Sequence, residues 1–168
     1  LVLCAAALAL LGCLAPSPAY TPPTVAELVP KSPEMVARVT KVRPTLQASK
    51  RMLTPQEAAA VVDAGALLVD VRTTKQIQVM TEGRMPAPAI VDPVDGWVAA
   101  GAAPQVMAGR KVVVTCTAGP KSTLAWEFLR EQGVDAYIID GGFNAWAAAG
   151  LPTRDVDGVE PVVVCPPS

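Results

Sequence analysis

A valine run, a short loop and an amphipathic helix follow one another over residues 111–130, and this unit constrains the fold more than any other stretch. Residues 112–114 are three consecutive valines, which is typical of a strand buried on both faces of a parallel sheet. Beyond the loop, apolar side chains recur at the spacing of one helix face: Leu124, Ala125, Phe128 and Leu129. The unit therefore predicts a parallel α/β sheet.

Cys116 follows the predicted strand directly, at the edge where open α/β sheets place their ligand sites. A thiol is nucleophilic as its thiolate. A helix amino terminus, the amides of a tight loop and a nearby cation favour that anion, and Gly119 and Lys121 would supply the last two. Ser122 or Thr123 could cap the helix. The alternative for Cys116 is a buried apolar side chain, because free cysteine is among the most buried residue types.

Four segments, in order, resemble the motifs of rhodanese-like domains over residues 52–153. They are a first strand and helix at 53–57, an Asp-Val-Arg strand end at 70–72, the loop at 116–122, and a closing Gly-Gly-Phe-Asn-Ala-Trp signature at 141–146. The resemblance implies a rhodanese-like α/β fold, in which a central parallel sheet is flanked by helices on both faces. The domain is expected to span residues 51–154.

The same resemblance implies a sulfurtransferase. Cys116 would accept sulfane sulfur from a donor such as thiosulfate, hold it as a persulfide, and pass it to a thiol or to cyanide. Lys121 would stabilise the charge, and further loop residues would bind substrate: Thr117, Ala118, Gly119 and Ser122. Arg72 would lie near the site, either in a structural ion pair or in contact with substrate. No cofactor is expected, and the expected partners are a small sulfur donor and a thiol acceptor.

Departures from the family pattern leave other functions open. Pro120 has no N–H to donate to a thiolate or persulfide, and Lys121 lacks the planar fork of an arginine. Residues 83–89 replace a Gly-His-Ile-Pro-Gly-Ala segment that is frequent in the family. These changes also fit a weak or inactive module that binds a partner or anchors a complex. A phosphatase or arsenate reductase on this scaffold is a third alternative, although its loop usually has one more residue and an arginine.

The start of the chain has the pattern of a targeting segment. Residues 1–15 are apolar and uncharged, and the small residues Ser17 and Ala19 precede a potential cleavage site. We therefore expect 1–19 to be a signal or targeting segment, which directs the protein to the periplasm, the exterior, or a plastid or thylakoid lumen. There are two alternatives: the Leu-Leu-Gly-Cys at 10–13 resembles a lipobox, which would lead to lipidation of Cys13, or the segment is retained as a membrane anchor. Membrane contact is expected only in those two cases.

The segments that flank the predicted domain carry weaker patterns. Residues 20–50 contain prolines at 22, 23, 30, 33 and 44 and several basic residues, which predicts a Pro-rich basic linker with one short helix at 33–39. Residues 155–168 are expected to form a C-terminal tail. At the start of the domain, the Thr-Pro-Gln-Glu at 54–57 has the pattern of a capping box with proline at the first helical position.

Composition excludes several chemistries. No histidine occurs in the 168 residues, so Ser-His-Asp and Cys-His catalysis and histidine metal ligands are excluded, whereas sulfur transfer needs none of these. No metal site is expected. The formal net charge of −1 gives no reason to expect nucleic acid as a partner. Cys116 and Cys165 could form a disulfide in an oxidising compartment, or Cys165 could remain unpaired.

Overall fold

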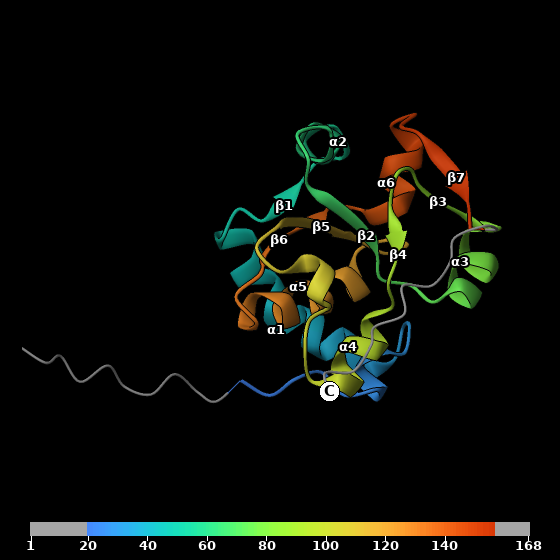
Figure 1. Ribbon diagram of the computed structural model, residues 1–168. Helices are drawn as coiled ribbons and strands as arrows, with labels where there is room; N and C mark the ends of the chain where they lie inside the picture. Colours follow the sequence, from blue (N-terminus) through green and yellow to red (C-terminus); the bar gives the residue numbers. More distant parts are fainter. Residues whose placement is uncertain (1–19, 157–168) are drawn as a thin grey trace, which may run out of the picture.

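The computed structural model describes residues 20–156, and its centre is a sheet of five parallel strands (Figure 1). In spatial order the strands are β1 (Met52–Leu53), β6 (Asp135–Ile139), β5 (Lys111–Thr115), β2 (Leu67–Asp70) and β4 (Ile90–Val91). The valine strand β5 lies in the middle, because its side chains are apolar on both faces and fully buried. A separate antiparallel pair joins β3 (Arg84–Pro86) to β7 (Thr153–Asp155).

Helices cover both faces of this sheet, which confirms the expected fold (Figure 1). One face carries α1 (Pro33–Ala48), α4 (Val94–Ala100) and α5 (Pro120–Glu131). The other carries α2 (Pro55–Asp63), α3 (Thr74–Thr81) and α6 (Gly142–Ala148). Two short 3-10 turns, η1 (Ala26–Leu28) and η2 (Gln105–Met107), add Leu28 and Met107 to the core.

Local capping explains where two of the helices begin. The predicted capping box of α2 is confirmed: the Glu57 amide donates to the Thr54 hydroxyl, and the Glu57 carboxylate accepts from the Thr54 amide at 2.8 Å. Thr73 and Gln76 form the same reciprocal pair at the start of α3. This capping box stabilises a helix of eight residues, which ends before the prolines at 86 and 88.

The segment before the domain is not the linker that the sequence predicts. The helix α1 has 16 residues, against the short helix expected at 33–39, and it packs along α5. Its buried side chains Met35, Val42 and Leu46 belong to the main core cluster. Pro44 lies inside the helix and removes one backbone hydrogen bond, a cost that packing of the narrow apolar stripe offsets. Tertiary packing therefore overrides the weak local pattern.

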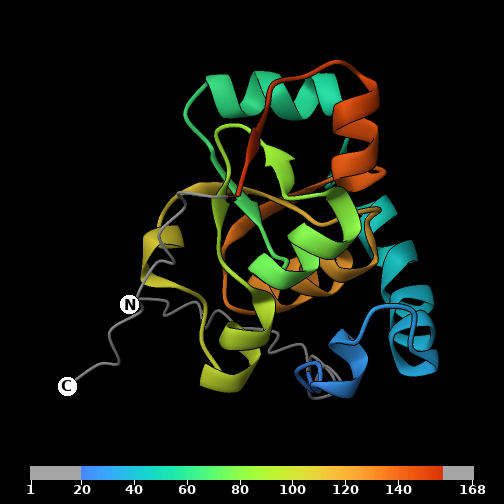
Figure 2. The ribbon, with the colours of Figure 1, turned by 90° about the vertical axis from the view of Figure 1, so that its right-hand side faces the viewer.

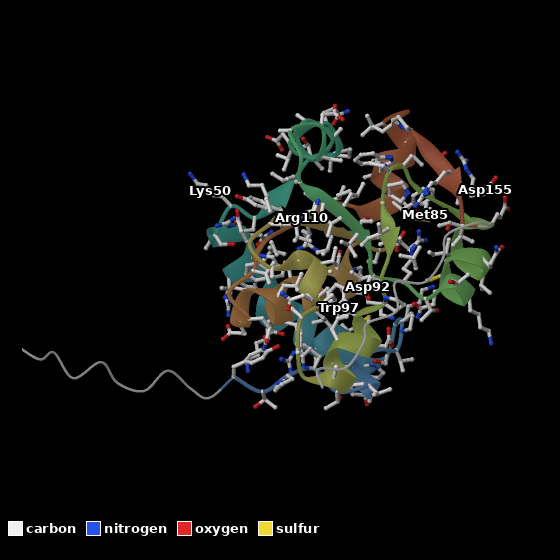
Figure 3. All side chains as sticks on the ribbon, in the orientation of Figure 1. Lys50, Met85, Asp92, Trp97, Arg110 and Asp155 are labelled. Atoms are coloured by element: carbon white, nitrogen blue, oxygen red, sulfur yellow. The ribbon has the colours of Figure 1, made fainter. Side chains whose placement is uncertain are left out.

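The turn from β4 into α4 buries a carboxylate beside an indole (Figure 3). Trp97 packs in the core, and its Nε1 donates to Asp92 Oδ1 at 2.8 Å. Pro93 occupies the cap position and α4 begins at Val94, so Asp95 lies in the first turn of the helix and does not cap it. The Asp95 side chain is consequently available for a longer-range contact.

Within residues 20–156, no helix is both long and apolar enough to cross a membrane. The expected targeting segment at 1–19, including Cys13, lies outside the described residues. So do most of the expected tail and Cys165, and Cys116 is a free thiol.

Candidate functional site

Cys116 directly follows β5, three residues before Gly119, the residue that caps helix α5. Helix α5 begins at Pro120, so neither Ser122 nor Thr123 is the cap that the sequence suggested; both hydroxyls donate to Gly119 O at 2.9 Å. Proline suits the first helical position, because its missing N–H would have no intrahelical partner there. The helix amino terminus therefore points toward the thiol.

The sulfur of Cys116 has two polar neighbours among the described residues. The Gly119 amide donates to Sγ at 3.2 Å, and Ser122 Oγ lies 3.7 Å from Sγ. Pro120 supplies no amide, so Gly119 is the loop residue whose N–H holds the sulfur. The Cys116 side chain is 3% exposed, and what remains accessible faces a pocket. The geometry suits a thiolate or a persulfide at this position.

The start of α6 holds the loop from behind. The amide of Phe143 donates to Cys116 O at 2.8 Å, and the amide of Asn144 donates to Thr117 O at 3.0 Å. Gly142, with φ +61°, makes this approach close: a Cβ atom there would lie 2.6 Å from Cys116 O. The closing signature of the domain thus fixes the backbone of the cysteine loop.

A pocket of about 440 Å³ opens at the sulfur. It lies at the carboxyl edge of the sheet, where Cys116 follows β5 and Arg72 follows β2. The lining residues are Pro30, Lys31, Met35, Arg72, Gln76, Met80, Cys116, Thr117, Ala118, Pro120, Lys121 and Asn144. The structure therefore places five of the predicted site residues around one cavity: Cys116, Lys121, Thr117, Ala118 and Arg72.

Gly119 and Ser122 lie beneath this cavity and do not line it. Ser122 is buried under the loop, where its hydroxyl faces the sulfur and a backbone carbonyl. Both residues therefore support the sulfur from the protein side. If they contact a substrate as predicted, they contact the sulfur atom that Cys116 has accepted from it.

Lys121 lines the pocket, but its ammonium group is bound by two other helices. Nζ lies 2.6 Å from Asp95 Oδ2 on α4 and donates to Gln76 Oε1 on α3 at 3.0 Å. The Lys121 side chain is 5% exposed. The expected electrostatic role is thereby weakened, because a carboxylate shares the positive charge. Sequence reasoning missed both partners, since neither lies near Lys121 in the chain.

Arg72 has the structural role that was one of its two predicted alternatives. Its guanidinium group forms a bidentate pair with Asp70, at 2.8 Å from Nε to Oδ1 and 2.6 Å from Nη2 to Oδ2. Nη1 donates to Thr81 Oγ1 at 2.9 Å, and the group lies over the Phe143 ring. Arg72 is fully buried. The pair therefore joins β2, α3 and α6 behind the pocket and leaves no open fork for a substrate anion.

Three pocket residues come from a part of the chain to which the sequence assigned no site. Pro30, Lys31 and Met35 lie before the predicted domain, and the packing of Met35 and α1 in the core brings this segment to the cavity. No local signal in the sequence marks them. Among the described residues, no group of three or more Cys, Asp or Glu side chains is placed to hold a metal ion.

The chain matches the family model of the rhodanese-like domain over residues 54–149. Two curated relatives are thiosulfate sulfurtransferases named GlpE. That of Pseudomonas savastanoi is 32% identical over 111 residues, which cover 64% of this chain and 96% of that enzyme. That of Actinobacillus succinogenes is 44% identical over 52 residues, 30% of this chain, and the match spans about half of that enzyme's length, 47%.

A solved structure from Rhodopseudomonas palustris, a protein of unknown function described as a possible tyrosine phosphatase, superposes with a TM-score of 0.58. It is 23% identical and covers 71% of this chain and 93% of its own. At this identity the likeness concerns the fold alone.

Proposed function

Because this chain belongs to the rhodanese-like domain family, we propose that it is a sulfurtransferase that carries sulfane sulfur as a persulfide on Cys116. The curated relatives support a sulfurtransferase-like role, since both are thiosulfate sulfurtransferases. We propose thiosulfate as a donor, and a thiol or cyanide as the acceptor.

One observation carries this proposal: the Cys116 sulfur meets a pocket on one side and a hydrogen-bond donor on the other. The Gly119 amide lies 3.2 Å from Sγ at the amino terminus of α5, so the protein side of the sulfur favours negative charge. The opposite side faces a cavity of about 440 Å³. The residues that line this cavity include no carboxylate that would repel an anionic donor.

The chemistry needs no proton transfer by the protein. The Cys116 thiolate attacks the outer sulfur of thiosulfate, the sulfur–sulfur bond of the donor breaks, and sulfite leaves with the electron pair. An acceptor thiolate or cyanide then attacks the outer sulfur of the persulfide, and the Cys116 thiolate leaves. The amide of Gly119 donates to the sulfur in both steps, and neither step needs a histidine, which this chain lacks.

Intact-mass analysis tests the persulfide directly. The full chain is incubated with thiosulfate, desalted and weighed, alongside Cys116→Ser and the matched control Cys165→Ser. We expect a gain of one sulfur atom in the wild type and in Cys165→Ser, none in Cys116→Ser, and loss of that sulfur when cyanide is added. A wild-type protein that gains no sulfur, or an equal gain in Cys116→Ser, would disprove the role of Cys116.

A non-catalytic binding module is the second candidate, and two observations favour it. Cys116 is 3% exposed, and the Lys121 ammonium group is bound by Asp95 and Gln76. Phosphoryl transfer has less support, because Arg72 is the arginine among the pocket-lining residues and Asp70 occupies its fork. Failure of the wild type both to gain sulfur and to produce thiocyanate would favour the module.

We also propose that residues 1–19 direct the protein out of the compartment in which it is made. The support is their uncharged apolar run and the small residues Ser17 and Ala19. Cleavage after Ala19 would leave the pocket-lining residues 30–35 on the mature chain. N-terminal sequencing of the protein from its native source checks this: a mature N-terminus at Tyr20 is expected, and a lipid-linked Cys13 would contradict it.

A further inference from the structure

One wall of the Cys116 pocket lies outside the rhodanese-like domain. Pro30, Lys31 and Met35 line the pocket, whereas the match to the family model begins at residue 54. Figure 2 shows the blue segment before α1 on the same side of the molecule as α3 and α4. The segment that precedes the domain, and not the domain itself, therefore shapes this side of the site.

This wall is fixed in place. The Ser32 hydroxyl accepts from the Met35 amide at 3.0 Å and caps α1, and Lys31 holds a left-handed conformation, φ 63°, that is uncommon outside glycine. One turn further along α1, Arg38 Nε lies 2.8 Å from Glu127 Oε2 on α5. The wall is thus anchored to the helix that begins at the cysteine loop.

The charges around the pocket leave one cation without a counter-ion. Arg72 is paired with Asp70, and Lys121 is paired with Asp95. Lys31 lines the pocket and forms no ion pair with any residue in the part of the chain that the structure describes. The lining residues include no carboxylate. An anionic ligand is therefore favoured, and Lys31 is the side chain positioned to attract it.

Apart from Lys31, the wall itself is apolar. Met35 and Pro30 from the extension lie at the same cavity as Met80 and Pro120 from the domain. Cavities of a few hundred cubic ångströms lined in this way usually hold an organic ligand, since they bury its apolar surface. At about 440 Å³ this pocket belongs to that class. An inorganic anion such as thiosulfate has no apolar part to place against the methionines.

From these contacts we infer that the extension selects an organic sulfur donor, one that bears a single anionic group and an apolar body. The inference rests on the proposed sulfurtransferase function. The anionic group faces Lys31, and the apolar body packs against Met35 and Met80. For an organic thiosulfonate, the Cys116 thiolate attacks the outer sulfur, the donor's sulfur–sulfur bond breaks, and a sulfinate leaves with the electron pair. The step needs no oxidant or reductant.

Binding of an unreactive analogue tests the wall without any turnover. Benzenesulfonate is titrated into the full chain, and the methionine methyl resonances are followed by NMR, with inorganic sulfate as the comparison. We expect benzenesulfonate to shift the Met35 and Met80 resonances at concentrations where sulfate does not. Lys31→Gln should weaken binding about threefold, in keeping with one exposed ionic contact, whereas Lys41→Gln, on α1 and outside the pocket lining, should not.

Donor kinetics test the same wall in catalysis. With cyanide as acceptor, kcat/KM is measured for benzenethiosulfonate and for thiosulfate. We expect Met35→Ala to lower kcat/KM about tenfold for benzenethiosulfonate and less than about twofold for thiosulfate, because only the organic donor loses apolar contact. Because Met35 is also a core residue, the folding of this variant is checked by circular dichroism. Lys31→Gln, at an exposed position, is the second variant and is measured with the same two donors.

The outcomes separate the inference from the function on which it rests. The protein could bind benzenesulfonate in a manner that depends on Lys31 and shifts the Met35 resonance, yet form no persulfide. That result would disprove the sulfurtransferase function and still support the ligand site. Persulfide formation with no methionine shift, or equal losses for both donors in Met35→Ala, would overturn the inference. Equal affinity in Lys31→Gln and Lys41→Gln would overturn the role of Lys31.

Discussion

Lys121 lies only five residues after Cys116 in the chain, yet its ammonium group is bound by residues of two other helices. Asp95 on α4 and Gln76 on α3 lie 2.6 and 3.0 Å from Nζ. These contacts join three helices around the cavity at the start of α5. The residue therefore both positions the loop and supplies a charge that Asp95 partly neutralises.

Substitution separates these two roles of Lys121. Lys121→Met removes the ammonium and leaves Asp95 without its partner, so we expect kcat/KM for thiosulfate to fall about tenfold and stability to fall by about 1 kcal/mol. Asp95→Asn keeps the ammonium and removes the competing charge, and we expect unchanged or higher kcat/KM. Steady-state kinetics and urea unfolding measure both variants. Equal losses of activity in the two would show that Lys121 acts through structure alone.

Asp92 is a buried carboxylate with one unsatisfied oxygen. Oδ1 accepts from Trp97, but Oδ2 has no hydrogen-bond partner among the described residues. Burial raises the pKa of the Asp92 carboxyl, and the Trp97 hydrogen bond opposes this only in part. The folded protein therefore holds the Asp92 proton more tightly than the unfolded chain does. The resulting stabilisation is complete below the unfolded pKa, about 4, and is lost as pH rises through the folded pKa.

Asp92→Asn should remove this pH dependence. The amide keeps an oxygen for Trp97 and replaces a buried charge with a buried dipole, which costs less, so we expect the free energy of unfolding at pH 7 to rise by about 1 kcal/mol. At pH 4 the variant and the wild type should differ little. Urea unfolding at both pH values measures this, with exposed Asp155→Asn as the control (Figure 3). A variant that is less stable at pH 7 would contradict the expectation.

At the scale of elements, the loop after β5 depends on how closely α6 approaches it. A Cβ atom on Gly142 would lie 2.6 Å from Cys116 O and 3.0 Å from Ala118 N, both backbone atoms that cannot turn aside. Gly150 has a similar φ, +69°, but open space around it. Both glycines therefore have a left-handed backbone, but an added Cβ atom would clash with other atoms only at Gly142.

Gly142→Ala is accordingly expected to displace the cysteine loop. We expect a loss of about 3 kcal/mol of stability and a loss of sulfur transfer of about tenfold or more, whereas Gly150→Ala should cost about 1 kcal/mol, from its backbone alone, and keep its activity. Thermal unfolding and thiocyanate formation measure the pair. Similar activities in the two variants would show that the loop does not depend on this contact.

Sequence patterns predicted elements well where local chemistry determines them. The capping box at Thr54 and the valine strand β5 have the predicted form, because side-chain type alone fixes a cap and a doubly buried strand. The predicted cap of α5, Ser122 or Thr123, lies at least three residues after the observed cap, Gly119. Ser122 is a better capping residue than glycine by preference, but Pro120 fits the first helical position and moves the cap to Gly119.

At the scale of the molecule, the motifs predicted the rhodanese-like fold and the residues of the cysteine loop, but not what surrounds them. The resemblance ends where the family domain ends, so it carried no information on residues 20–50. The apolar residues of α1 form a narrow stripe interrupted by Pro44, which resembles a linker until α5 is present to bury it. The partners of Lys121 and the pocket wall at Met35 arise from that packing and have no local signature.

If α1 belongs to the folded core, truncating one of its buried side chains must destabilise the whole domain. Leu46 is 0% exposed and lies in the main cluster with the sheet and α5, whereas Val36, on the same helix, is 57% exposed. We expect Leu46→Ala to lower the free energy of unfolding by about 2–5 kcal/mol and Val36→Ala to change it by less than about 0.5 kcal/mol. A single cooperative urea transition should report both. If residues 20–50 were a linker, both substitutions would have the same small effect on the free energy of unfolding. In that case α1 would unfold independently of the domain, and the pocket wall at Met35 would be lost when it did.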